Sequence, residues 1–135
     1  MRSNILASSG IQAGILCCWS ASGAIGMSGS YDWNWSFYGD VATPVRTKFV
    51  TVFPLPNEKV ETASKGSLVF TTPFFTIMDL VRWDCEAEFV LNALAFWEAR
   101  HGNLDAIWKG LEERGLMEKY LIEYEPYRAE WKEVY

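Results

Sequence analysis

The sequence has little of what metal and catalytic sites are usually built from. Its 135 residues include one His and three Cys. Cys17, Cys18 and Cys85 lack the spacing of zinc ligands and are too few for a structural zinc site. Adjacent cysteines rarely pair with each other, so a reduced, cytoplasmic protein is expected. We expect no metal and no cofactor.

The usual catalytic motifs are also missing. The glycines between Gly10 and Gly29 lack both the lysine of a phosphate loop and a strand before it. No Ser or Cys has a base near it in the sequence. His101 is placed at the end of a predicted helix, where its ring can satisfy terminal carbonyl groups. No catalytic residue is therefore identified, and an enzyme whose site is assembled from distant residues stays open.

Charge is absent between Arg2 and Asp32. A signal peptide would fit this region, with an apolar stretch over Ile5–Trp19 and a small-residue exit at Ala21–Gly23. Frequent glycines and low hydrophobicity disfavour a membrane span and favour an Ala/Gly-rich helix packed closely on its neighbours. The expected faces of that helix are Ile11, Ile15 and Cys18, followed by Ala21, Ala24 and Ile25.

What the chain does contain is enough for a core. Half of its residues are hydrophobic and seven are Trp, which argues against disorder and indicates one domain over residues 1–135. Residues 1–66 carry a net charge of +1 and residues 67–135 a net charge of −6. The acidic half disfavours direct nucleic-acid binding, and it fits either a basic partner or a solvated surface.

The best-defined stretch is a strand that turns into a helix. Ser67–Thr71 is rich in strand-forming residues, Thr72 can cap a helix, and Pro73 suits the first helical position. Apolar residues then follow at helical spacing, at Phe74, Ile77, Met78 and Val81. Asp79 and Arg82 are three residues apart, so we expect them to pair on the helix surface.

Before this junction the sequence predicts strands. Lys48–Phe53 is β-branched and aromatic, and it is expected to pair with Ser67–Thr71. Turn signals lie at Gly39-Asp40 and Thr43-Pro44. Together they predict a small, mostly antiparallel sheet.

The aromatic segment from Tyr31 to Tyr38 is expected to be a strand or an extended loop. Its aromatic side chains can cover the core of this small domain, since the first half has few other large residues. They can also form a partner-binding surface, because Trp and Tyr dominate interface hot spots. The residues of that surface would be Tyr31, Trp33, Trp35 and Tyr38.

After the junction the sequence predicts helices joined by short connections. One is capped by Asp84, runs to about Arg100 and ends at Gly102. The others are expected over Leu104–Arg114, Leu116 to about Tyr124, and Tyr127–Val134. The predicted class is α+β: a small sheet, an Ala/Gly-rich N-terminal helix and a C-terminal helical bundle.

The central stretch resembles a known family. Thr71, Thr72, Pro73, Thr76, Asp79 and Leu80 match the strand-to-helix signature of the type IV antitoxins and transcriptional regulators of bacterial abortive-infection E systems. Phe75 stands where that signature usually has Arg. Ser20–Met27 is similar to the family's small-residue helix, and Lys48–Phe53 lies where the family has a strand. The family's regulators usually carry an N-terminal winged helix-turn-helix, and we expect 135 residues to leave no room for one.

The resemblance implies a toxin-neutralising type of domain that binds a protein partner and does not read DNA. Non-catalytic binding of a protein partner is therefore the favoured function. Two alternatives remain: an acidic inhibitor from a phage or mobile element that occupies the nucleic-acid groove of a host defence enzyme, and a small enzyme.

Overall fold

The computed structural model describes residues 14–27 and 33–130. Several sequence predictions lie outside these ranges: the charged start of a signal peptide at Arg2, most of its apolar stretch from Ile5, the helix position of Ile11, the surface role of Tyr31, and the end of the predicted helix Tyr127–Val134. Within the described residues, no helix is long and apolar enough to cross a membrane.

The strands form one mixed sheet in the order β3-β4-β2-β1-β6-β5. Three of its pairings are antiparallel (β1–β2, β3–β4 and β5–β6), and two are parallel (β1–β6 and β2–β4). The strands are β1 (Ile15–Leu16), β2 (Trp35–Gly39), β3 (Val45–Arg46), β4 (Val50–Pro54), β5 (Thr62–Lys65) and β6 (Leu68–Thr71).

The predicted pairing of Lys48–Phe53 with Ser67–Thr71 is wrong. β6 lies between β1 and β5, while β4 lies between β3 and β2. A tight hairpin turn at Gly66, with φ of 63°, gives β6 a local partner in β5. The short strand β1 takes its other edge, so β4 and β6 never meet.

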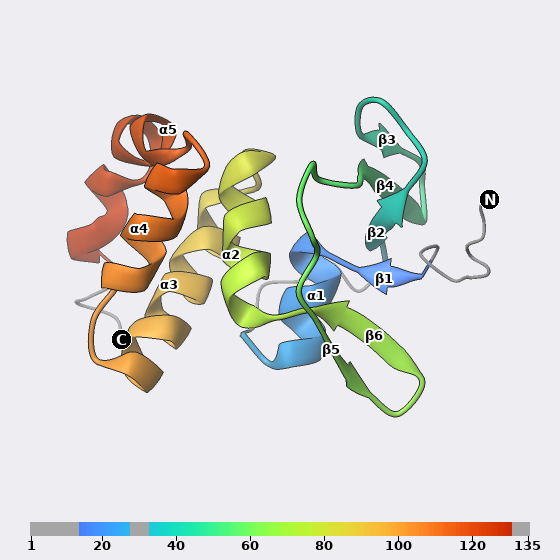
Figure 1. Cartoon of the computed structure of the whole chain (residues 1–135), viewed down its shortest axis with the longest axis horizontal. Coiled ribbons are helices and arrows are strands. Elements are labelled where there is room, and N and C mark those ends of the chain that lie inside the picture. Colours follow the sequence, from blue (N-terminus) through green and yellow to red (C-terminus); the bar gives the residue numbers. More distant parts are fainter. Residues whose placement is uncertain (1–13, 28–32, 131–135) are drawn as a thin grey trace.

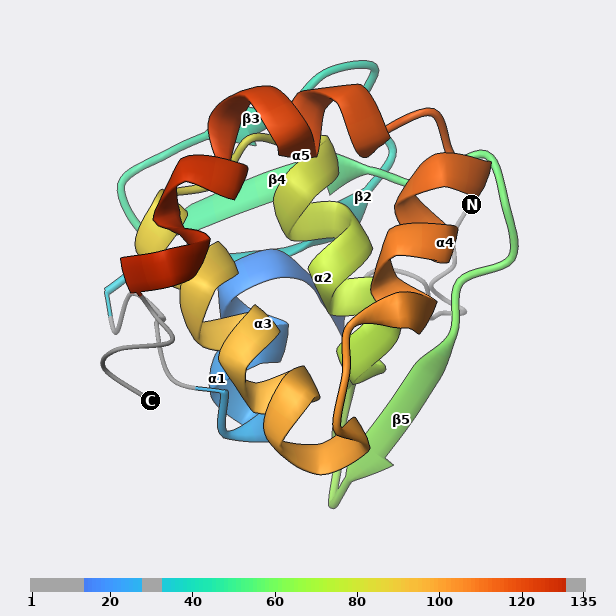
Figure 2. The same ribbon diagram turned by 90° about the vertical axis from the view of Figure 1, so that its left-hand side faces the viewer.

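Helices make up the rest of the fold and confirm the α+β class. They are α1 (Cys18–Ile25), α2 (Pro73–Arg82), α3 (Ala87–His101), α4 (Asp105–Glu113) and α5 (Met117–Glu123), followed by the 3-10 helix η2 (Glu125–Tyr127) and helical residues 128–130. The helical side covers the sheet, and α2 lies between α1 on one side and α3 and α4 on the other (Figure 1, Figure 2).

Helix α2 is the centre of the core. Its start is as predicted: the Thr72 hydroxyl accepts from the Phe75 amide at 3.4 Å, and Pro73 is the first helical residue. Every residue from Phe75 to Val81 is buried. Each large apolar side chain there contributes about 1.5–3 kcal/mol on burial, which explains why the fold is arranged around this helix.

Two helix starts differ from prediction. Ile15 belongs to a strand, so the small-residue helix begins only at Cys18, after a sharp reversal in which Cys18 has φ of 49°. Asp84 does not cap α3. It has φ of 55° and ends α2, because the next amide, on Cys85, bonds back to the Leu80 carbonyl at 3.0 Å. The end of α3 at Gly102 is confirmed, with φ of 83°.

Candidate partner-binding surface and polar cleft

The outer face of the sheet at β2 and β4 is apolar. The two strands pair in parallel over five residues, and the side chains of Ser36, Tyr38, Thr51 and Phe53 are buried. Strand alternation therefore places the intervening residues on the opposite face. That outer sheet face includes Trp35, Val50 and Val52, with Val45 of β3 paired beside Val52. Phe37 has the same orientation but packs against the buried Leu16, Ala21 and Phe70.

Large side chains on and beside this face are exposed. The exposed fractions are 54% for Trp33, 51% for Trp35 and 62% for Phe49. Basic groups surround them: the Arg46 guanidinium lies 5.6 Å from the Trp33 ring centroid, and the Lys48 ammonium 5.3 Å from that of Phe49. An apolar centre with a charged rim is the usual composition of a protein-binding patch.

A buried amide fixes the two tryptophans. Asn34, between them in sequence, is fully buried, and its amide nitrogen donates to the Thr47 carbonyl at 3.0 Å. Its amide oxygen accepts from the Thr51 hydroxyl at 2.8 Å. Asn34 therefore ties the segment to the β3–β4 turn and positions Trp33 and Trp35. No sequence pattern indicates this role, because the partners of Asn34 are distant in the chain.

The residues of the predicted partner-binding surface that the structure describes differ in their exposure to solvent. Trp33 and Trp35 are exposed, as a binding role requires, and that role stays a prediction. Tyr38 is fully buried, so its proposed contact with a partner is corrected: strand alternation turns it toward α2. Tyr31 lies outside the described residues.

Tyr38 instead meets the central helix through a hydrogen bond. Its hydroxyl donates to Oδ2 of Asp79, and Arg82 Nη1 donates to Oδ1 of the same carboxylate at 2.7 Å. The predicted Asp79–Arg82 pair exists, but Asp79 is fully buried, so its expected position on the helix surface is wrong. Thr76, on the same helix, bonds to Thr71 at the end of β6.

Burial is the largest effect on the pKa of the Asp79 carboxyl group. Desolvation raises the pKa of Asp79 to about 6, against the opposing effects of Tyr38 and Arg82, and Glu58 adds a smaller increase. The same burial raises the pKa of the Tyr38 hydroxyl, so the tyrosine remains a donor. The polar contact between β2 and α2 thus holds a carboxyl group that titrates near neutral pH.

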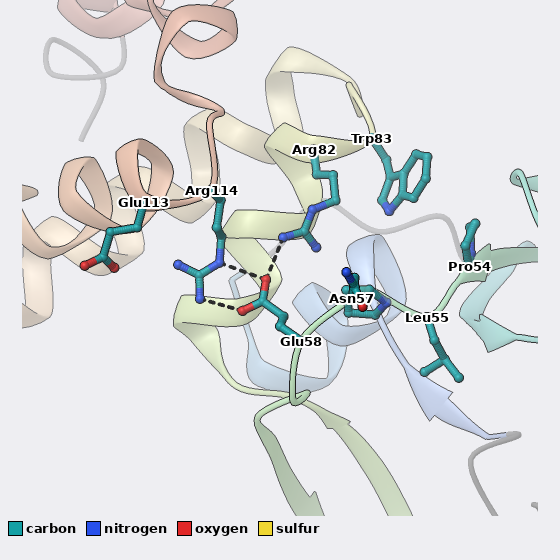
Figure 3. A pocket seen from close by; sticks show the side chains of 9 residues that line it. Pro54, Leu55, Asn57, Glu58, Arg82, Trp83, Glu113 and Arg114 are labelled. Carbon is teal, nitrogen blue, oxygen red and sulfur yellow. Dashed lines mark hydrogen bonds and ion pairs between the residues drawn. The ribbon is translucent and has the colours of Figure 1, made fainter.

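Arg82 also lines a cleft of about 630 Å³ beside the ends of β4 and α2 (Figure 3). Here Glu58 lies between two guanidinium groups. Arg114 holds it through two bonds, of 3.0 and 2.8 Å, and Arg82 through one of 3.0 Å. The cleft is further lined by Pro54, Leu55, Pro56, Asn57, Trp83 and Glu113.

A smaller cavity of about 250 Å³ is lined by Cys85 with its neighbours Asp84 and Glu86, and by Trp19 and Phe53. A hydrogen bond with Cys18 and burial raise the pKa of the Cys85 thiol. The thiol therefore stays protonated, which disfavours a cysteine nucleophile. All three cysteines are buried free thiols.

His101 is not part of either cavity. Its ring stacks on Trp97 with centroids 3.8 Å apart, and its Nδ1 lies 3.1 Å from the Trp97 carbonyl oxygen at the end of α3. This position agrees with the predicted role at the helix terminus. Across residues 14–27 and 33–130, no three His, Cys, Asp or Glu side chains are grouped so that they could hold a metal ion.

These features define a class, a small α+β protein with an exposed apolar sheet face and an arginine-lined cleft. Comparison with protein-family models, curated proteins and solved structures found no match for the chain.

Proposed function

We propose that this protein is a non-catalytic binding domain that sequesters a protein partner, in the manner of an antitoxin or a regulatory domain. The observation that carries the proposal is the exposure of two tryptophans at the start of β2. Trp35 on the outer sheet face and Trp33 just before the strand are each more than half exposed, and the buried amide of Asn34 between them ties this segment to the β3–β4 turn.

Exposed large apolar side chains favour aggregation unless a binding partner covers them. Single exposed apolar residues are common, but several contiguous large ones indicate an interaction site. Trp35 and Val45 are both more than two-fifths exposed and share the outer sheet face, and Phe49, which is 62% exposed, lies in the turn directly before β4. Buried tryptophans at an interface typically contribute about 2 kcal/mol or more each, so two of them can dominate the affinity.

The test is capture of the partner from a lysate of the native organism, followed by mass spectrometry. The bait is compared with a Trp33→Ala/Trp35→Ala double variant. We expect the double variant to keep its fold, since both side chains are largely outside the core, and to lose at least about tenfold in partner affinity. Circular dichroism establishes that the fold is retained.

The matched control is Leu121→Ala/Ile122→Ala, which removes two large apolar side chains that are 50% and 69% exposed on α5. This control should capture the partner as well as the unchanged protein does. If the helix variant loses the partner and the tryptophan variant keeps it, the binding surface lies on the helical side and the proposal is wrong.

The antitoxin form of the proposal has a test of its own. Co-expression with a nucleotidyltransferase encoded beside this gene should rescue growth that the transferase alone arrests. Rescue should fail with Trp33→Ala/Trp35→Ala and persist with Leu121→Ala/Ile122→Ala. A toxicity that the unchanged protein does not relieve would exclude an antitoxin of that transferase.

A further inference from the structure

The two arginines of the cleft are held in place without Glu58. Arg82 is fixed by its 2.7 Å bond to the buried Asp79. Arg114 donates from Nη1 to the Gly110 carbonyl at 3.0 Å, and its guanidinium lies 5.2 Å from the Phe74 ring centroid. Two guanidinium groups anchored from behind form a preorganised receptor for an anion.

Glu58 binds to the two arginines, and the segment that carries it makes few other contacts with the rest of the protein. Residues 55–60 belong to no helix or strand. Val60 packs against the core, and the next firm contacts are at Glu61, which accepts from both the amide and the hydroxyl of Thr72. The Glu58 side chain is 31% exposed, so solvent and other solutes reach the carboxylate.

The space beside the receptor is open and has further donor capacity. In Figure 3 the indole nitrogen of Trp83 is turned toward the space between Asn57 and Pro54, while the Arg82 guanidinium faces Glu58. At about 630 Å³, the cleft is large enough for an amino-acid side chain and the backbone that carries it.

We propose that Arg82 and Arg114 form a carboxylate-binding site in which Glu58 is an exchangeable occupant, and that an acidic side chain of the protein partner takes its place. This inference rests on the proposed function for the identity of the ligand, but the site itself can be tested without a partner.

Exchange of one carboxylate for another keeps the charge of the cleft unchanged. The incoming group makes the bidentate contact with Arg114 that Glu58 makes now, and the segment 55–60 loses its principal tie to the helices. Glu58 competes as an intramolecular ligand, with an effective concentration in the millimolar range or above. An acid offered in solution should therefore bind the unchanged protein weakly and a variant without Glu58 more tightly.

The experiment titrates two probes into the protein, following the backbone amides of residues 55–61 and the arginine side-chain signals by NMR. The probes are glutarate and the blocked peptide acetyl-alanyl-glutamyl-alanine amide, with the glutamine version of the peptide as a control for charge. Glu58→Ala should bind both acids saturably, about tenfold or more tightly than the unchanged protein does.

Three variants complete the design. Glu61→Ala removes a carboxylate from the same segment that touches neither arginine, and it should bind the probes as weakly as the unchanged protein. Glu58→Gln keeps the shape of the side chain and should also gain affinity, which covers the case in which Glu58→Ala is unfolded. Glu58→Ala/Arg114→Gln should lose the gain.

Binding of both acids in this pattern supports the proposal. Binding of glutarate but not of the peptide would overturn the protein side chain as ligand and leave a site for small acids. Absence of saturable binding in a folded Glu58→Ala or Glu58→Gln protein would overturn the site. Neither negative result concerns the tryptophan surface, whose own test is the capture experiment above.

Discussion

Replacing Asp79 by alanine gives a prediction whose sign depends on pH. The folded-state pKa of Asp79 is about 6, against 3.8 for an ordinary aspartate, because burial disfavours the charged form. Between these two values the folded protein holds more protons than the unfolded chain. The free energy of unfolding therefore falls as pH rises through this window, and the contribution of Asp79 is constant above it.

The magnitude follows from the difference between the two pKa values. By linkage, the contribution of Asp79 to stability declines by about 2 kcal/mol between pH 4 and pH 7. Alanine has no such dependence. The deficit of Asp79→Ala relative to the unchanged protein should therefore be about 2 kcal/mol larger at pH 4 than at pH 7. At pH 7 a deficit of about 1–3 kcal/mol remains, because the buried Tyr38 hydroxyl loses its acceptor.

The assay is urea unfolding at pH 4, 5, 6 and 7, followed by tryptophan fluorescence. Taking the difference between the two proteins cancels groups that do not interact with Asp79. Glu58 does interact with it, so the comparison is repeated in a Glu58→Gln background, where the pKa of Asp79 should be lower. A deficit that is larger at pH 7 than at pH 4 would refute the reasoning, since the contacts of Tyr38 and Arg82 would then outweigh desolvation.

Three further changes have defined outcomes. Tyr38→Phe removes a donor that lowers the pKa of Asp79, so its cost of about 1–2 kcal/mol should grow as pH rises from 5 to 7, opposite to Asp79→Ala; a cost independent of pH would contradict this. Gly110→Ala should lower stability by about 1–3 kcal/mol in urea unfolding, because the new methyl group would meet Phe74 Cζ at 2.4 Å; a gain in stability would show that α4 can shift. Thr72→Ala should cost about 1 kcal/mol by loss of the helix cap, and Thr72→Ser should restore most of it; equal losses would mean that the cap contributes nothing.

Local signals in the sequence predicted much of the fold. The start of α2 at Thr72 and Pro73 and the end of α3 at Gly102 depend on short-range hydrogen bonding and backbone conformation, and both are confirmed. Asp84 shows the limit of such signals. An acidic residue before a helix fits an N-cap, but here the same residue is needed to end the preceding helix.

The strand order could not be predicted in this way. Exposed strands such as β5, whose four residues carry no alternating pattern, give no periodic signal. The pairing of β6 with β1 joins segments about fifty residues apart, so it depends on the packing of the whole domain.

The candidate sites show the same difference between local signals, which the sequence contains, and long-range contacts, which it does not reveal. Trp33 and Trp35 are visible in the sequence as an aromatic cluster, although their exposure is not. The helical spacing of Asp79 and Arg82 predicts that they pair. It does not predict that Asp79 is buried and bonded to Tyr38, which is 41 residues away. Glu58 and Arg114 are 56 residues apart, and nothing in their surroundings indicates that they meet.

The central position of β1 in the sheet has a consequence for synthesis of the chain. β1 lies in the interior of the sheet, where it joins β2 on one side to β6 on the other. The later of these two partners, β6, ends only at Thr71. A nascent chain on the ribosome therefore cannot form the complete sheet until the middle of the sequence has emerged. The helix α2, which packs against the sheet, follows only after that. Pairing between segments so far apart in the sequence slows folding. We therefore expect the first half to stay incompletely folded during synthesis, with its tryptophans accessible to chaperones, until the second half has been made.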